Sequence, residues 1–228
     1  MGVYAMKVPF DPSIAIPLIA EVVAPYPKAG LSQLMDEGHT TTFEQLVACI
    51  ISIRTLDEIM LPVARRLFEV VSTPHTVSQL STETIENLIY GCGFHKQKAA
   101  QIHAIAEKVV SEYGGVLPCD LDVLLSLRGV GPKCAHLVLS IACGRPYIGV
   151  DTHVHRITNR WGYVVGKTPE KTLAALEAKL PREYWSEINR LLVPFGKNVC
   201  MPLAPKCPMC PIQHMCQQIG VAKQTKEQ

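Results

Sequence analysis

Two side chains near the middle of the chain have types and surroundings that suit nucleophilic chemistry, and Lys133 is the first. It follows the Gly-Val-Gly turn of residues 129–131 and Pro132, and proline favours the first position of a helix. The positive end of the helix dipole, together with partial burial, would disfavour the ammonium form and favour a free amine, which is a nucleophile. A solvated lysine at a helix start is the alternative.

Asp151, eighteen residues after Lys133, is the second candidate. It precedes the segment Thr152-His153-Val154-His155-Arg156, which predicts a helix whose first N–H groups the Asp151 carboxylate would cap. Hydrogen bonds from these N–H groups would keep the carboxylate ionised. A helix cap without a catalytic role is the alternative.

The residues around Lys133 predict two helices joined by a tight hairpin. Asp120 can cap a short helix over 121–127, and an apolar helix would run from Pro132 to a left-handed C-cap at Gly144. Glycines in the hairpin permit positive φ and expose backbone N–H groups at a helix N-terminus, which suits a phosphate. A plain turn is the alternative. The hairpin residues are Gly129, Val130 and Gly131.

Four cysteines near the C-terminus form a second chemical cluster, with the spacing C-x6-C-x2-C-x5-C. Prolines keep most of this segment out of helix, so that it can wrap around a centre. Zinc sites and [4Fe–4S] clusters both use four cysteine thiolates, and the spacing alone leaves both open. Lys206, between the first two cysteines, could contact a phosphate or be solvated. The four residues are Cys200, Cys207, Cys210 and Cys216.

The composition indicates a soluble globular protein. The 228 residues are 48 % hydrophobic and 18 % charged, enough for one large or two small domains. A formal net charge of +2 requires any nucleic-acid site to be a local patch. The apolar run near the N-terminus is too short to span a bilayer. Without a secretory signal, the other five cysteines are expected to be reduced packing residues and not disulfides: Cys49, Cys92, Cys119, Cys134 and Cys143.

Helical periodicity and capping signals recur from residue 12 to about residue 194, and the alternating pattern of β-strands is missing. We therefore predict an all-α protein. The expected helices cover approximately residues 12–23, 43–53, 57–68, 82–90, 99–113, 121–127, 132–144, 168–179 and 182–194, and a further helix is expected to start at Thr152.

Two motifs resemble the endonuclease III family, which comprises DNA base-excision glycosylases of the helix–hairpin–helix, Gly-Pro-Asp superfamily. They are LRGVGPK at 127–133 and VDTHVHR at 150–156, and the cysteine spacing is also similar. Arg128 stands where the family usually has proline, and the Gly-Pro-Asp tripeptide is Gly149-Val150-Asp151 here. Neither departure removes a reacting group.

The resemblance covers nearly the whole chain and implies a two-lobed, all-α fold. A six-helix domain over residues 35–145 would contain the hairpin. Residues 1–34 and 146–228 would together form the iron–sulfur cluster domain.

The resemblance implies a bifunctional DNA glycosylase and abasic-site lyase of base excision repair, which removes oxidised pyrimidines. Lys133 would be the nucleophile and Asp151 the assisting carboxylate. The four clustered cysteines would hold a [4Fe–4S] cluster, and the hairpin carbonyls a monovalent cation. The partner would be double-stranded DNA with damaged bases or abasic sites. The enzyme would act as a monomer, in the bacterial cytoplasm at the nucleoid or in a eukaryotic nucleus.

Relatives fill the gap left by a flipped nucleotide with side chains that map onto Arg54, Phe94 and His153. Arginine stands at position 54 where glutamine is common. It would favour lesions opposite guanine, and a surface ion pair with Asp57 or Glu58 is the alternative.

Two other functions remain open. An adenine or mismatch glycosylase of the same superfamily would have a similar hairpin and cluster, but such enzymes generally lack the lysine at position 133. A non-catalytic iron–sulfur protein that binds DNA or transfers electrons would not need the pair of Lys133 and Asp151.

Overall fold

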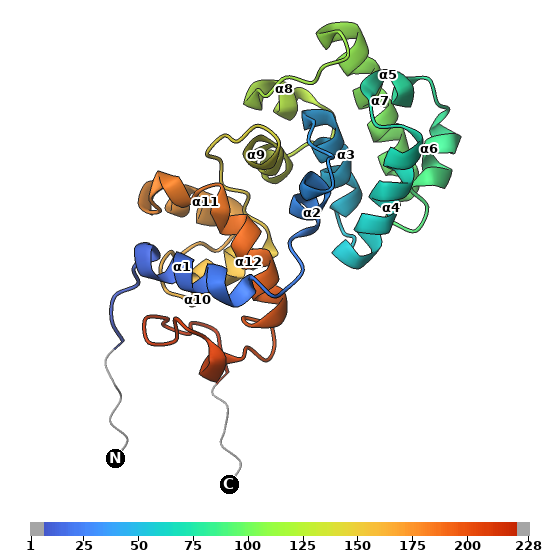
Figure 1. Ribbon diagram of the computed structural model, residues 1–228. Helices are drawn as coiled ribbons and strands as arrows, with labels where there is room; N and C mark the ends of the chain where they lie inside the picture. The colour runs from blue at the N-terminus through green and yellow to red at the C-terminus, as the bar shows by residue number, and fades with distance from the viewer. Residues whose placement is uncertain (1–6, 223–228) are drawn as a thin grey trace, which may run out of the picture. The chain divides into compact units, whose positions relative to one another are not determined.

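The computed structural model describes residues 7–222, which form twelve α-helices and two 3₁₀ helices (Figure 1). None of these residues lies in a β-strand, so the all-α prediction is confirmed. No helix in the described part of the chain has the length and apolar character needed to cross a membrane. The chain divides into two compact units.

The first unit, residues 29–147, is called the hairpin unit here and is built around α3 (Thr42–Ser52). All residues of α3 from Phe43 to Ile51 are buried, because α2, α4, α7 and α9 pack around this helix. Two polar residues of this buried stretch bond to the chain before the helix: Glu44 Oε2 accepts from Thr41 Oγ1 at 2.7 Å, and Gln45 Nε2 donates to His39 O at 2.7 Å. The other helices of the unit are α2 (Gly30–Asp36), α4 (Asp57–Val70), α5 (Pro74–Ser78), α6 (Thr82–Leu88), α7 (His95–Tyr113), α8 (Leu121–Ser126) and α9 (Pro132–Ile141).

The second unit, residues 7–28 and 148–222 of the described chain, is called the cysteine unit and packs around Trp161 and Phe195. Both α1 and α10 pack against α12. Phe10 stacks on Trp161 with 4.6 Å between ring centroids, which joins the N-terminal segment to this core. The elements are α1 (Pro12–Val23), α10 (Thr152–Arg160), α11 (Pro169–Lys179), η1 (Arg182–Tyr184), α12 (Glu187–Asn198) and η2 (Cys207–Met209).

The two compact units divide the chain at 28/29 and 147/148, a few residues from the expected domain limits. Helix α2 belongs to the hairpin unit because Leu31 and Leu34 pack into its core. Ile148 and Val150 pack into the core of the cysteine unit. The assignment of functional domains stays a prediction.

Several helix boundaries differ from those expected. α7 begins at His95, earlier than predicted, and follows Phe94 in the left-handed region (φ +60°). α9 ends at Ile141 with Ala142 as its C-cap, so Gly144 (φ +60°) turns the chain beyond the helix and does not cap it. α2 and α5 are too short for periodicity to predict.

One prediction about the cysteines is wrong, because Cys119 and Cys143 form a disulfide. Cys119 precedes α8 and Cys143 follows α9, so the bond closes a loop around the whole helix–hairpin–helix. The hydroxyl of Thr42, at the start of α3, lies 3.4 Å from the Cys119 sulfur. The prediction rested on the compartment, whereas the pairing follows from the folded positions of the two chain segments. Cys49, Cys92 and Cys134 are buried free cysteines, as expected.

The double variant Cys119→Ser/Cys143→Ser should lower the free energy of unfolding by about 3–4 kcal/mol, because the bond closes a loop of 24 residues in the unfolded chain. Denaturant unfolding without reductant measures this difference. Adding dithiothreitol should shift the wild type and leave the double variant unchanged. A wild type that unfolds at the same midpoint with and without reductant would contradict the prediction.

Candidate functional site

The hairpin between α8 and α9 is a tight turn with one glycine in the left-handed region. Gly129 has φ +76°, which residues with a side chain rarely adopt. Val130 is buried and donates its N–H to Leu127 O at 3.1 Å. Its N–H is therefore used inside the turn, so a phosphate would meet Gly131 and the first turn of α9, whose N–H groups have no partners within the helix.

One polar residue caps the helix before the hairpin, and another bonds to the backbone of the hairpin. Asp120 caps α8 as predicted, with Oδ1 accepting from Val123 N at 3.0 Å. Gln101 of α7 donates from Nε2 to Arg128 O at 2.8 Å and leaves little room for a Cβ at Gly129. Sequence reasoning missed Gln101, because a glutamine on a helix surface carries no signal of a distant partner.

Lys133 is the second residue of α9 and its side chain is exposed, so the expected partial burial is wrong. Two buried thiols, those of Cys49 and Cys134, hydrogen-bond to each other beneath this part of the helix. That bond lowers the pKa of Cys49 and raises the pKa of Cys134, while the charge of Lys133 acts on both in the lowering direction. The amine therefore lies at an exposed helix start, and the buried part of α9 begins at Cys134.

Asp151 is the N-cap of α10 in the cysteine unit, as predicted. Its Oδ1 accepts from His153 N at 2.9 Å and from Val154 N at 2.8 Å. Oδ2 takes no part in these two bonds. The half-buried carboxylate is therefore oriented by the helix start through one oxygen, and the other oxygen is not needed for the cap.

Asn189 of α12 holds the backbone just before Asp151, and sequence reasoning missed it. Its Nδ2 donates to Gly149 O at 3.0 Å, and the residue is 8 % exposed. An asparagine among the apolar residues of a helix is the available signal, since a buried amide normally has a fixed hydrogen-bond partner.

His153, one of the predicted DNA contacts, is half-buried against α12. The guanidinium of Arg156 lies 3.3 Å from His153 Nδ1 and donates to Gly196 O and Cys200 O at 3.2 and 3.0 Å. Arg156 therefore links the start of α10 to the first residue of the cysteine cluster.

Arg54 and Phe94, the other two residues expected to fill the gap of a flipped nucleotide, lie together in the hairpin unit. The Arg54 guanidinium carbon is 5.3 Å from the centroid of the Phe94 ring, a cation–π contact. Both residues are exposed, and both adopt positive φ, +53° and +60° respectively. Such backbone angles outside glycine concentrate at functional sites.

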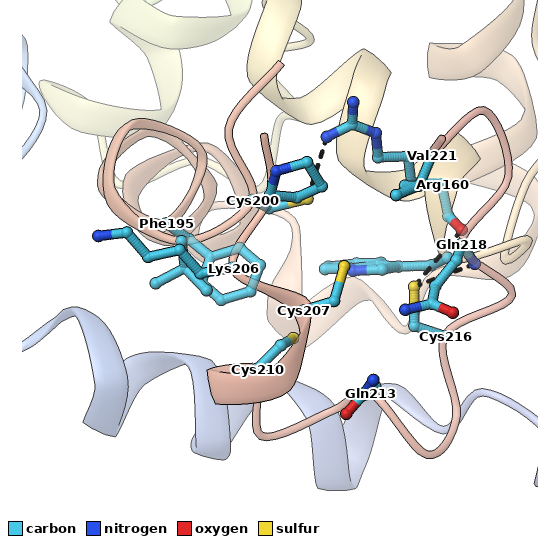
Figure 2. Close-up of a pocket in the computed structure, with 13 residues that line it drawn as sticks. Arg160, Phe195, Cys200, Lys206, Cys207, Cys210, Gln213, Cys216, Gln218 and Val221 are labelled. Atoms are coloured by element: carbon cyan, nitrogen blue, oxygen red, sulfur yellow. Dashed lines mark hydrogen bonds between the residues drawn. The ribbon is translucent and has the colours of Figure 1, made fainter. Parts of the chain in front are cut away.

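All four clustered cysteines line one pocket of the cysteine unit (Figure 2). Trp161, Phe195 and Val199 make much of the wall apolar. Lys206 lies on the same pocket with an exposed side chain. The cysteines come from the turn just after α12, from η2 and from the segment that follows η2: Cys200, Cys207, Cys210 and Cys216.

Two N–H groups donate toward the sulfurs of this pocket. Arg160 Nη1 lies 3.6 Å from Cys200 Sγ, and the backbone N of Gln218 lies 3.4 Å from Cys216 Sγ (Figure 2). Hydrogen bonds to sulfur are one of the features that set the reduction potential of iron–sulfur clusters. Arg160 also donates to two backbone carbonyls of the cysteine loop and so fixes its shape.

The thiols of this pocket need a positive centre to ionise. Burial raises the pKa of Cys210 to about 12 and also raises the pKa of Cys216, and the neighbouring cysteines act in the same direction. Within residues 7–222, no group of three or more His, Cys, Asp or Glu side chains forms a ready site for a metal ion. The donor set of four cysteines with apolar walls and N–H donors fits an iron–sulfur cluster.

Comparisons with known proteins show the family of this chain. A family model described as the HhH-GPD superfamily of base excision DNA repair proteins matches residues 47–182. Endonuclease III of Thermotoga maritima is 38 % identical over 200 residues, which cover 88 % of this chain and 91 % of that protein. Endonuclease III-like protein 1 of Bos taurus is 40 % identical over 177 residues, which cover 76 % of this chain and 58 % of that longer protein.

Solved structures give the same result. A structure of a trapped endonuclease III–DNA covalent intermediate, with an estranged adenine, matches this chain with a TM-score of 0.79 and 32 % identity. The match covers 90 % of this chain and 94 % of that one. The chain therefore belongs to the HhH-GPD superfamily of base excision DNA repair proteins and is an endonuclease III-like DNA glycosylase.

Proposed function

We propose that this glycosylase is bifunctional: it removes oxidised pyrimidines from double-stranded DNA and cleaves the strand at the resulting abasic site, acting as a monomer. The observation that carries the proposal is the exposed amine of Lys133 in the first turn of α9, directly after the hairpin. The trapped covalent intermediate of the relative at 32 % identity supports covalent chemistry in this family.

Lys133 would act on a nucleotide that has been flipped out of the duplex, since the sugar is not reachable within the stack. Its nitrogen attacks C1′, the bond to the base breaks, and the base leaves with the bonding electrons. The nitrogen then loses a proton, the C1′–O4′ bond opens and O4′ takes up a proton, which gives a Schiff base. The Schiff base makes the C2′ proton acidic. Loss of that proton and departure of the 3′-phosphate cut the strand, and water then releases the lysine.

Asp151 and the hairpin would support these steps. The Asp151 carboxylate stabilises the positive charge that develops on the sugar and accepts or delivers protons. The N–H groups at Gly131 and the start of α9 bind a phosphate of the DNA backbone, and the hairpin carbonyls hold a monovalent cation. His153 and Lys206 are further DNA contacts in this proposal.

A duplex with one thymine glycol, incubated with enzyme and borohydride, tests the proposal. A bifunctional glycosylase leaves a cleaved strand and a trapped covalent complex. Release of a base without trapping would favour an adenine or mismatch glycosylase of the superfamily, and binding without either product a non-catalytic protein. Either result would refute the bifunctional mechanism.

We also propose that the four clustered cysteines hold a [4Fe–4S] cluster, which supplies the positive centre that their buried thiolates require. The purified protein should be brown and contain about four irons per chain. Elemental analysis measures the metal content, and Cys210→Ala should lose the iron. The variant Cys119→Ser/Cys143→Ser, which alters cysteines outside the cluster, should keep it. One zinc per chain without iron would contradict the assignment.

Arg54 should make cleavage depend on the base opposite the lesion. A guanidinium can bind guanine through two hydrogen bonds, which contributes about 1–3 kcal/mol of discrimination. In single-turnover cleavage of one lesion opposite each of the four bases, the wild type should prefer guanine, and Arg54→Ala should lose this preference. Arg65→Ala is the control, because Arg65 pairs with Glu37 on the surface of the same unit. An equal loss with all four opposite bases would assign Arg54 to phosphate binding or structure.

A further inference from the structure

Lys98 of α7 is a buried lysine that the proposed reaction does not use. It is 4 % exposed, and its Nζ donates to Ile51 O and Ile53 O at 2.7 Å each and to Thr55 Oγ1 at 3.2 Å. All three ammonium hydrogens are therefore used on neutral oxygens. Desolvation lowers the pKa of Lys98, so burial of this charge is unfavourable by itself. An apolar side chain would fill the same space without this cost, but it could not form the three hydrogen bonds that hold the backbone after α3.

The oxygens bound by Lys98 lie where α3 ends and the chain leaves the helix. The last carbonyls of a helix lack partners within it, and a positive charge there complements the helix dipole. Arg54 lies between the acceptors Ile53 and Thr55 and has φ +53°. Lys98 thus fixes the backbone on both sides of a residue in a conformation that is unfavourable for arginine.

Thr55 connects this segment to the one that carries Phe94. Its Oγ1 accepts from Gly93 N at 3.2 Å as well as from Lys98. A Cβ on Gly93 would lie 3.0 Å from Arg54 O, so the two backbones touch at a residue without a side chain. Phe94 comes next with φ +60°, and its ring meets the Arg54 guanidinium.

We propose that Lys98 is a positioning residue that holds Arg54 and Phe94 as one preassembled wedge for the gap left by the flipped nucleotide. The inference rests on the proposed function, because the wedge has a use only where a nucleotide leaves a duplex. A non-glycine residue stays in the left-handed region only where its surroundings hold it there. The hydrogen bonds of Lys98 and Thr55 hold the backbone around Arg54 and just before Phe94. Because the two side chains are already ordered in the free protein, DNA binding does not have to include the entropic cost of ordering them.

The test compares an abasic site in a duplex with the same site in a single strand, which has no gap to fill. Lys98→Met keeps the length of the side chain and removes its donors; Thr55→Val removes the shared hydroxyl, and Thr55→Ser keeps it. In Lys98→Met and Thr55→Val, the rate of single-turnover cleavage of the duplex should fall about tenfold more than the rate with the single strand. Without the hydrogen bonds, binding must supply the free energy that holds Arg54 in the left-handed conformation, and this free energy corresponds to about a tenfold change in rate. Both variants should also narrow the differences between the four opposite bases, and Thr55→Ser should behave like the wild type.

Lys108→Met is the matched control, because Lys108 lies on the same helix and contacts Ser126 and Glu112, away from the wedge. Equal losses on duplex and single strand in Lys98→Met and Thr55→Val would make Lys98 a purely structural residue and overturn the inference. If Lys98→Met does not fold, the comparison of Thr55→Val with Thr55→Ser tests the inference: only Thr55→Val should lose more cleavage on the duplex than on the single strand. A wild type that cleaves neither substrate would refute the proposed function and the inference with it, whereas a selective failure of the variants leaves the function standing.

Discussion

We expect Lys133→Gln to lose strand cleavage and borohydride trapping by roughly 10⁴-fold or more, because a glutamine amide cannot attack C1′. The Lys133 side chain is exposed, so the substitution removes no core contact and the variant should fold like the wild type. DNA binding should persist, because the hairpin backbone is unchanged. The yield of the borohydride-trapped complex on a duplex with an abasic site measures the loss of chemistry. The affinity of the variant for the same DNA measures whether binding is retained.

Lys133→Arg separates charge from nucleophilicity. It keeps a positive charge at the start of α9, and a guanidinium does not lose its proton in proteins. This variant should bind DNA as the wild type does and still fail to form a Schiff base. A trapped complex in Lys133→Gln would show that another amine attacks the sugar and would refute the assignment.

Asp151→Asn should lower turnover by about 10²–10³-fold and leave the melting temperature nearly unchanged. Only Oδ1 caps α10, accepting from His153 N and Val154 N, and an asparagine oxygen can accept the same two bonds. The substitution therefore removes the negative charge and the second carboxylate oxygen without removing the cap. Single-turnover kinetics and thermal unfolding of the same preparation measure the two effects separately.

Asp151→Ala is the matched variant for the cap. It should lose activity to a similar extent and, in addition, about 1 kcal/mol of stability, because two N–H groups at the start of α10 lose their acceptor. Full activity in Asp151→Asn would reduce the role of Asp151 to capping.

The sequence by itself determined the features that depend on neighbours a few residues apart. Pro132 starts α9, Asp120 caps α8, Asp151 caps α10, and Gly129 takes the positive φ of the hairpin. Each of these signals acts over two to four residues, within the reach of one backbone turn. Helical periodicity gave the all-α class for the same reason.

Only the tertiary structure decided which residues meet across large separations in the chain. The disulfide of Cys119 with Cys143, the bond from Gln101 to the hairpin and the bond from Asn189 to Gly149 all depend on how helices pack. The exposure of Lys133 likewise depends on what covers the start of α9, and the sequence does not state it.

The contact between Arg54 and Phe94 has the same origin. The resemblance named both residues as side chains for the gap of a flipped nucleotide, but it did not say that they touch. Lys98, 43 to 47 residues from its partners on α3 and the following loop, fixes the backbone around Arg54. Hydrogen bonds of this kind require α3 and α7 to be packed together, so their partners are set by packing geometry and not by spacing in the chain.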